Sequence, residues 1–465
     1  MTCEFDAVWA WQAFRPSPQS PWDRKKVGHL YRRAAFGATQ AEIEDALKAG
    51  PEKTIQALLD GGNGMAEFDQ LTAPLAETIG RDNNGNQAVA WWLYRMLYGP
   101  YPLREKLTLF WHNHFATSNA KVQNASYMLG QYRLLQQQAL GSFRTLLREM
   151  STDPAMMVWL DTKDSKKRMP NENYARELME LFSLGIGNYT EKDVREAARA
   201  FSGWELKAGK SVFNPAQHDD GEKTVLGRRG RWQGSDIGRI CLEQPCAASF
   251  IVGKIYRFLV SESTPAGPEL LEPLARQFRD SDYDIRALVG TILRSNIFFS
   301  PASYRTRIKS PVDFALGIVR PLEGRLGTGA LAVALEELGQ KLFYPPTVKG
   351  WDGGAAWLNG QTLLFRQNLG LALTSTEDPR FGRRTDPAAV VRQLNKHSDQ
   401  EIVEFFLQLF LQGDVPDETR ARLLRYAEST RRQGVPVYWT EEDANDHRIR
   451  AICHLVLSLP EFQLD

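Results

Sequence analysis

The chain has 465 residues, 43% of them hydrophobic and 11% aromatic, which is enough material for roughly one to three domains with large cores. Its 57 basic and 56 acidic residues nearly cancel, so no overall positive field draws the chain to nucleic acid or to an anionic membrane. No apolar run approaches the ~20 residues of a membrane-spanning helix. We therefore expect a globular protein with no nucleic-acid partner and no membrane span.

Residues 1–24 are expected to form an N-terminal extension. Glu4 and Asp6 stand where a secretory signal peptide carries a basic run, so the sequence predicts a cytoplasmic protein. Export together with a signal-bearing partner is the alternative, and it would place the chain in the periplasm.

Residues 25–373 are expected to form the main helical domain. Apolar residues recur at spacings of three and four, as in Leu103, Leu107 and Phe110, which is typical of amphipathic helices. Alternating strand patterns are scarce. The expected helix starts carry N-cap signals at Thr39 with Glu42, Thr190 with Asp193, Ser398 with Glu401, Ser310 before Pro311, and Asp386 before Pro387. The sequence thus predicts a mainly α protein, a bundle-like array of many helices with long irregular loops and at most a short β-hairpin.

The stretch FWHNHF at residues 110–115 places His112 and His114 one residue apart. On an extended segment both imidazoles would face one metal ion, whereas on a helix positions two apart diverge by about 200°. The apolar stripe that starts at Leu103 predicts a helix reaching His114, and Asn113 gives that helix a place to end. Both histidines are candidate metal ligands, and packing inside the protein is the alternative for each.

A helix is also expected after Pro170, with Arg176, Glu177 and Glu180 on one face among apolar neighbours. A buried polar strip needs paired charges or a bound ion, so Glu177 is a candidate metal ligand and Glu180 a bridging ligand or general base. Arg176 would orient a carboxylate or an anionic substrate. The alternative is a solvated face whose charges pair along the helix.

The segment 204–235 is rich in Gly, Asp and Lys and breaks the helical pattern, with room for short strands or a hairpin. His218, Asp219 and Lys223 offer nitrogen and oxygen atoms beside a glycine. We therefore treat His218 and Asp219 as candidate metal ligands and Lys223 as a candidate catalytic residue. An Asp/Gly turn that binds nothing is the alternative.

A second irregular segment, residues 343–360, is rich in Pro, Gly and Trp. Trp351, Trp357 and Arg366 are candidate substrate-binding residues, because flat aromatic faces stack on sugar rings and other planar groups; filling gaps between helices is the alternative. Beyond it, residues 374–385 are expected to be a linker and residues 386–465 a C-terminal helical subdomain, or the end of one continuous domain.

Several motifs are shared with a known family. They are HLYRRAAFGAT from His29, LREKLTLFWHNHF, DPAMMVWLD, PNENYARELMELFSLGIGNYT, HDDGEKTVLG, RIKSPVDF and YPPTVKGWDGGAAWLNGQTLLFR. With these motifs the chain resembles the bacterial family catalogued as domain of unknown function 1800, from about residue 25 to the end. The resemblance implies a largely helical, enzyme-like protein, often exported and often encoded beside a partner that resembles the alkaline phosphatase and sulfatase superfamily.

Three functional hypotheses follow. The first is a metal-dependent hydrolase or oxygenase with zinc, manganese or iron held by His112, His114, Glu177, His218 and Asp219, ligands that would converge from separate segments. The second is a metal-free hydrolase of a glycan-like or other small polar substrate, with two carboxylates as acid and base and the tryptophan loop as platform. The third is a non-catalytic partner of a phosphatase- or sulfatase-like protein, which would show an apolar surface patch.

Overall fold

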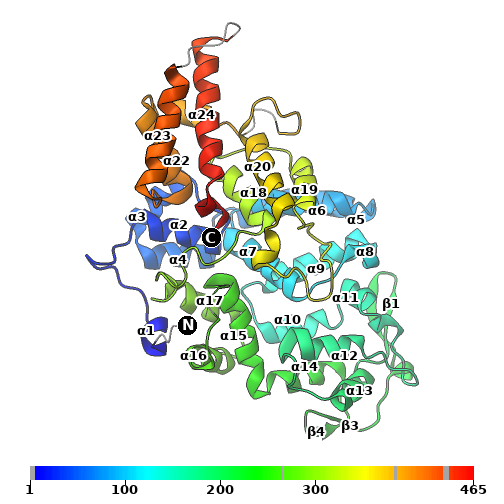
Figure 1. The fold of residues 1–465 in the computed structure, drawn as a ribbon. Coiled ribbons are helices and arrows are strands. Elements are labelled where there is room, and N and C mark those ends of the chain that lie inside the picture. The colour runs from blue at the N-terminus through cyan, green and yellow to red at the C-terminus, as the bar shows by residue number, and fades with distance from the viewer. Residues whose placement is uncertain (1–5, 264, 382–384, 433–438) are drawn as a thin grey trace.

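The structure is a computed structural model, and it describes residues 6–263, 265–381, 385–432 and 439–465. These residues are mainly α-helical and form two small antiparallel sheets of two strands each (Figure 1). The predicted fold class is therefore confirmed. Within the described residues, no helix combines the length and the apolar composition that crossing a membrane requires.

The first third of the chain is helical throughout. Its helices are α1 (Ala7–Trp11), α2 (Arg24–Ala34), α3 (Gln40–Ala49), α4 (Pro51–Asp60), α5 (Met65–Arg81), α6 (Gly85–Tyr98), α7 (Pro102–His114), α8 (Asn119–Val122), α9 (Ala125–Gln138), α10 (Phe143–Met150) and α11 (Pro154–Trp159).

The middle third holds the strands and a π-helix. Its elements are η1 (Thr162–Asp164), α12 (Asn173–Glu177), the π-helix η2 (Leu178–Ser183), α13 (Glu191–Ala200), β1 (Trp204–Lys207), β2 (Lys210–Phe213), η3 (Pro215–Gln217), β3 (Lys223–Val225), β4 (Arg228–Gly230), α14 (Gly234–Leu242), α15 (Pro245–Leu259), α16 (Pro268–Asp280) and α17 (Ile285–Arg294).

The last third is helical again. Its elements are α18 (Pro311–Val319), α19 (Thr328–Glu337), η4 (Gly354–Trp357), α20 (Gly360–Thr374), α21 (Pro387–Gln393), α22 (Asp399–Leu411), α23 (Asp417–Arg432), α24 (Glu441–Leu457) and η6 (Pro460–Gln463).

The predicted helix starts are found where the sequence signals place them. Side chains cap the first turn, because the first N–H groups of a helix have no partner within it. The confirmed caps are Thr39, Thr190 and Ser398, each with a reciprocal capping box, and Ser310 and Asp386, each followed by proline.

Both sheets are tight hairpins in the segment that the sequence marks as irregular. Strands β1 and β2 pair antiparallel, as do β3 and β4. Each turn has two central residues with positive φ, Ala208 and Gly209 in the first and Leu226 and Gly227 in the second. This geometry suits two-residue hairpins because it matches the twist of the strands.

Two large hydrophobic cores meet at α7. Leu103, Leu107 and Trp111 belong to the core that also contains α12 to α17. Leu109, on the same helix, belongs to the core formed by α6, α9 and the helices from α18 to α24. Figure 1 shows α7 in the middle of the molecule, between these two groups of helices. The end of α7 is thus held rigidly at the junction of the two cores.

The C-terminal helices share the second core with α18 to α20. Helix α20 ends at Thr374 and α21 begins at Pro387, so the expected linker does separate two helices. Residues 382–384 of that linker lie outside the described residues. The division of the chain into a main domain and a C-terminal subdomain stays a prediction.

Candidate functional site

Helix α7 runs to His114 and carries the FWHNHF stretch in its last turn. Because the stretch is helical, the two imidazoles point to different parts of the protein. His112 contacts Phe343, whereas His114 contacts Phe182 and Lys254. The predicted extension of the helix to His114 is confirmed, and the two rings do not share a partner.

His112 fastens the Pro/Gly/Trp loop to α7. Its Nε2 accepts a hydrogen bond from the backbone N–H of Phe343 at 3.2 Å, and its ring packs edge-on against Trp92 and Trp351. Burial lowers the pKa of His112 to about 3, so the ring is neutral at ordinary pH. The contacts of Nε2 are those of a structural residue.

Asn113 is the second anchor of the same loop. Its Oδ1 accepts a hydrogen bond from the backbone N–H of Trp351 at 2.7 Å, and its Nδ2 donates to the Trp351 carbonyl at 3.3 Å. The approach is so close that a Cβ on Gly350 would collide with Oδ1 of Asn113. Gly350 also has a φ of +81°, which favours glycine. The loop position therefore depends on this Asn–Gly contact.

His114 joins α7 to the π-helix η2 and to α15. Its Nε2 donates to the carbonyl of Phe182 at 3.1 Å, which leaves Nδ1 as an acceptor, and Lys254 Nζ donates to it at 3.2 Å. Burial, followed by the charge of Lys254, holds the pKa of His114 well below its usual value. The imidazole is neutral and its tautomer is fixed by its two partners.

Lys254 lies on α15 and completes this contact. Its Nζ also donates to the carbonyl of Leu181 at 2.8 Å and lies 4.6 Å from the centre of the Phe250 ring. Among the residues that the structure describes, no carboxylate forms an ion pair with Lys254. Burial lowers the pKa of Lys254 to about 8. A half-buried lysine without a carboxylate partner is costly to keep charged, which marks Lys254 as a candidate functional group.

His114 and Lys254 border a cleft of about 310 Å³, a size that suits a small organic molecule. Aromatic side chains form its apolar walls, namely Phe110 from α7, Phe258 from α15, and Trp351 and Trp357 from the loop 343–360. Both tryptophans are 8% exposed. The structure thus places the two predicted tryptophans and one of the predicted histidines in one cavity.

The charged groups of the cleft are unequally paired. Arg307 donates to Glu262 at 3.2 Å. Asp313 also lines the cleft, and it forms a fully buried ion pair with Lys106, which does not line it. The remaining cations of the cleft are Lys254, Arg257 and Lys349, and its remaining carboxylate is Asp352. Arg257 and Lys349 are exposed and form no ion pair with any described residue. The cleft therefore presents a surplus of positive charge to a ligand.

The predicted acidic helix face lies beside the cleft rather than in it. Glu180 accepts a hydrogen bond from the Tyr189 hydroxyl at 2.6 Å. Arg176 donates to both oxygens of Glu191, at 2.6 and 2.8 Å, and these hydrogen bonds raise its pKa. Glu191 lies on α13, whereas the pair along the same helix that the solvated-face alternative describes is Arg176 with Glu172, at 3.4 Å.

Glu177 differs from its neighbours on that face. It forms no hydrogen bond or ion pair with a residue that the structure describes. Burial, and then the charge of Glu180, raise the pKa of Glu177, and the charge of Lys349 partly opposes them. Glu177 thus lies within electrostatic reach of the rim of the cleft.

His218, Asp219 and Lys223 form a separate polar cluster around α13. His218 Nδ1 donates to the carbonyl of Ser202 at 2.9 Å. Asp219 accepts two hydrogen bonds from Arg199, which lower its pKa, and Lys223 donates to the carbonyls of Asp219 and Gly221. These side chains hold the 214–227 segment against α13 and leave few of their atoms unpaired.

The predicted metal ligands do not come together as one set. Over the described parts of the chain, no three side chains of His, Cys, Asp or Glu gather as a metal site would require. His112, His114 and His218 instead bond to three different backbone segments. Metal binding by these residues stays a prediction from the sequence.

Arg366 lies away from the cleft, in the core near the end of the chain. It is fully buried, donates to the carbonyl of Lys309 at 2.7 Å and to Gln463 at 3.2 Å, and stacks on Phe314. Burial lowers its pKa to about 10. These contacts tie α20 to α18 and η6.

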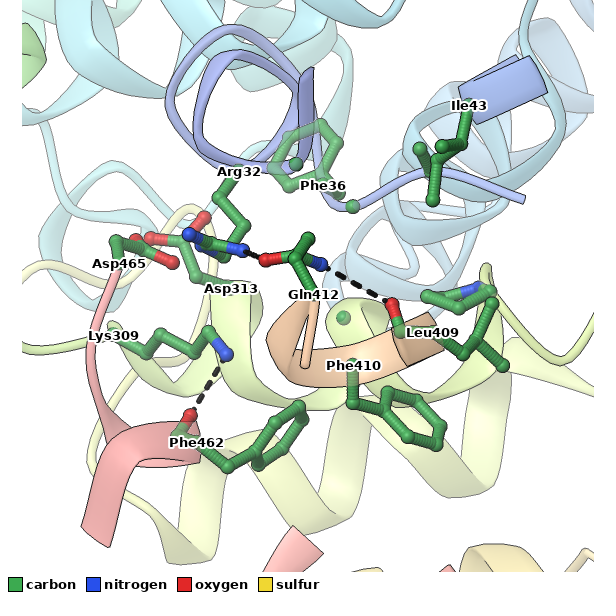
Figure 2. A pocket seen from close by; sticks show the side chains of 15 residues that line it. Arg32, Phe36, Ile43, Lys309, Asp313, Leu409, Phe410, Gln412, Phe462 and Asp465 are labelled. Carbon is green, nitrogen blue, oxygen red and sulfur yellow. Dashed lines mark hydrogen bonds between the residues drawn. The ribbon is translucent and has the colours of Figure 1, made fainter. Parts of the chain in front are cut away.

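A second cavity lies between α2, α18 and α22 (Figure 2). Arg32 and Gln412 are hydrogen-bonded beside it, and Lys309 Nζ donates to the carbonyl of Phe462 at 2.7 Å. Its volume is about 20 Å³, which is enough for one molecule of the size of water. The cleft at the end of α7 is the candidate functional site because His114, Trp351 and Trp357 line it together.

Lys254 and Arg257 are the residues that sequence reasoning missed. On this otherwise apolar helix Lys254 is half-buried and Arg257 is exposed, and Phe250 and Phe258 flank Lys254 at a spacing of four. Two cations three residues apart, framed by aromatics and without acidic neighbours on their helix, were the available signal.

Comparison with known proteins identifies the family of the chain. No curated protein and no solved structure matches it. The family described as "Protein of unknown function (DUF1800)" matches residues 29–464, nearly the whole length, and this range includes every residue that lines the cleft. The protein belongs to the DUF1800 family.

Proposed function

We propose that the 310 Å³ cleft is the active site of an enzyme that acts on a small organic anion, with Lys254 as the group that gives and takes a proton. One observation carries the proposal. The Lys254 amine borders the cleft and is held by two acceptors, His114 Nδ1 and the Leu181 carbonyl, with no carboxylate partner among the described residues. Perturbed amines of this kind are common in active sites.

The charge of the cleft supports an anionic ligand. Three cations of the cleft form no ion pair with a described residue, namely Lys254, Arg257 and Lys349. Among the described residues that line the cleft, Asp352 is the one carboxylate without an ion pair. A carboxylate or phosphate group would supply the missing counter-charge. The four aromatic walls would hold the apolar or planar part of such a molecule.

The protonation state of Lys254 supports proton transfer near neutral pH. With a pKa of about 8, both the ammonium and the free amine are populated there. His114 is a positioning residue in this proposal, because its lowered pKa prevents it from keeping the proton.

The experiment is a ligand-observed NMR screen of small mono- and dicarboxylates and their phosphate analogues against the purified protein. We expect binding that weakens as salt rises, because the cations of the cleft are partly exposed. The variants Lys254→Met and Arg257→Gln should lose affinity. Arg168→Gln is the matched control, since Arg168 is exposed and lies outside the cleft.

Two results would contradict the proposal. One is the absence of any anion that binds in the screen. The other is binding that Lys254→Met, Arg257→Gln and Arg168→Gln affect equally.

The other hypotheses from the sequence stay predictions. For the metal-dependent reaction, a transition metal in one-to-one amount in the purified protein would support it. No bound metal together with an unchanged unfolding temperature in chelator would contradict it. A partner of the phosphatase or sulfatase class and a periplasmic location likewise remain predictions that rest on the family resemblance.

A further inference from the structure

The hydrogen bonds of Lys254 orient its amine as a nucleophile. Nζ has four positions: the bond to its own carbon, the N–H to Leu181, the N–H to His114, and one more. Both partners are acceptors, because a carbonyl cannot donate and because His114 uses its own N–H on Phe182. Loss of the ammonium proton therefore leaves both N–H bonds in place. The lone pair then occupies the fourth position, on an amine that lines the cleft.

A lone pair held in this way suits a carbonyl carbon. Neutral lysine amines attack aldehydes and ketones to form imines, and they do so where burial keeps the amine unprotonated. Phe110, Phe258, Trp351 and Trp357 form an apolar wall of the cleft, against which the carbon skeleton of the imine would pack. Arg257 and Lys349 line the same cleft and would pair with an anionic group of the carbonyl compound.

We propose that the substrate of the cleft is an oxo acid, an aldehyde or ketone that bears a carboxylate, and that Lys254 binds it covalently as an imine. This inference rests on the proposed function, since it names the substrate class of the same site.

The step balances with one proton taken up from solvent. The amine nitrogen forms a bond to the carbonyl carbon, the carbonyl π electrons move to oxygen, and a proton passes from nitrogen to that oxygen. The nitrogen lone pair then expels the hydroxyl, which takes the solvent proton and leaves as water, so that the C–O bond breaks and the C=N bond of an iminium forms. No oxidation occurs. The iminium keeps one N–H, which is enough for one of the two acceptors, Leu181 or His114.

The experiment is reductive trapping. The full-length protein is incubated with glyoxylate and cyanoborohydride, and each lysine is then measured by peptide mass spectrometry. The reduced product is carboxymethyl-lysine, and succinate serves as an anion that has no carbonyl group. The comparison lysine is Lys53, which is exposed and lies outside the cleft. At neutral pH the unprotonated fraction expected for a pKa of about 8 is on the order of a hundredfold above that of an ordinary lysine.

We expect carboxymethylation of Lys254 well ahead of Lys53, and competition by succinate. Trapping that is spread evenly over the exposed lysines would overturn the inference. If small carboxylates bind the cleft in the NMR screen but Lys254 is not trapped, the carbonyl substrate is wrong and the proposed function stands. If neither occurs, both fail. The two lysines are compared within the wild-type protein, so the test does not depend on how Lys254→Met folds. Lys53→Met is the matched variant in which the trapping yield is measured again.

Discussion

Lys254 of α15 donates a hydrogen bond to Nδ1 of His114 of α7 at 3.2 Å, across a sequence separation of 140 residues. The contact joins two helices at the edge of one cleft. It also gives a half-buried ammonium a neutral partner instead of a carboxylate. Burial lowers the pKa of Lys254 to about 8, so its contribution to the free energy of unfolding depends on pH above that value.

The first prediction concerns stability in alkali. The folded-state pKa of Lys254, about 8, lies below the 10.5 of an ordinary lysine. Between these values the unfolded chain binds more protons, so the Lys254 contribution to the free energy of unfolding rises with pH, by up to about 1.4 kcal/mol per pH unit. The free energy of unfolding of the wild type minus that of Lys254→Met, measured by chemical unfolding, should therefore rise from about pH 8 to about pH 10. Lys53→Met is the control, and a difference that stays constant with pH would contradict the assignment.

The second prediction concerns acid. His112 is neutral in the folded protein with a pKa of about 3, so below 6.5, the pKa of an ordinary histidine, the unfolded chain binds the extra proton. The free energy of unfolding should then fall by about 1.4 kcal/mol per pH unit for this residue. Unfolding of His112→Leu should show a shallower loss between about pH 6 and about pH 4 than wild type does. The exposed His397, changed to Gln, is the control. An equal acid slope for His112→Leu and wild type would refute the prediction.

The third prediction concerns the loop 343–360. Asn113→Ala removes both hydrogen bonds to Trp351, each worth about 1 kcal/mol. Hydrogen exchange should become faster in the loop, while α7 itself stays protected. Asn124→Ala is the matched control, because Asn124 caps α9 and should loosen that helix instead. If the loop exchanges at the wild-type rate in Asn113→Ala, the two bonds do not hold it.

The fourth prediction separates close packing from backbone strain. Gly350 and Gly187 have similar positive φ values, +81° and +88°. A Cβ at Gly350 would collide with Asn113, whereas a Cβ at Gly187 meets nothing within 4 Å. Gly187→Ala should cost only the strain, about 1 kcal/mol. Gly350→Ala should cost more and should also speed hydrogen exchange in the loop. Equal losses of unfolding free energy in the two variants would mean that the contact with Asn113 contributes nothing.

The sequence predicted the architecture well because local rules govern it. Capping residues such as Thr39 and Ser398 mark helix starts through contacts within a single turn. The helical stripe from Leu103 correctly predicted that α7 reaches His114. Trp351 and Trp357, predicted as substrate-binding residues, both line the cleft, whereas Arg366 does not; substrate binding by the tryptophans stays a prediction.

The candidate site was harder to predict because long-range contacts form it. Lys254 stands out only after α15 packs against α7 and the π-helix, and neither contact is visible in the sequence around position 254. His218 and Asp219 showed the opposite problem. They look like ligands in the sequence, but nearby groups such as Ser202 and Arg199 bond to them in the folded chain.

The pH profile of acetylation at Lys254 tests the central claim most directly. The full-length protein is treated with a limiting amount of an acetylating reagent at a series of pH values, with and without a small dicarboxylate. The extent of acetylation at each lysine is then measured by mass spectrometry. The account predicts that Lys254 reacts with a midpoint near pH 8, earlier than Lys53, and that the dicarboxylate protects it. Acetylation of Lys254 that follows Lys53 at every pH and is unaffected by the dicarboxylate would contradict the account.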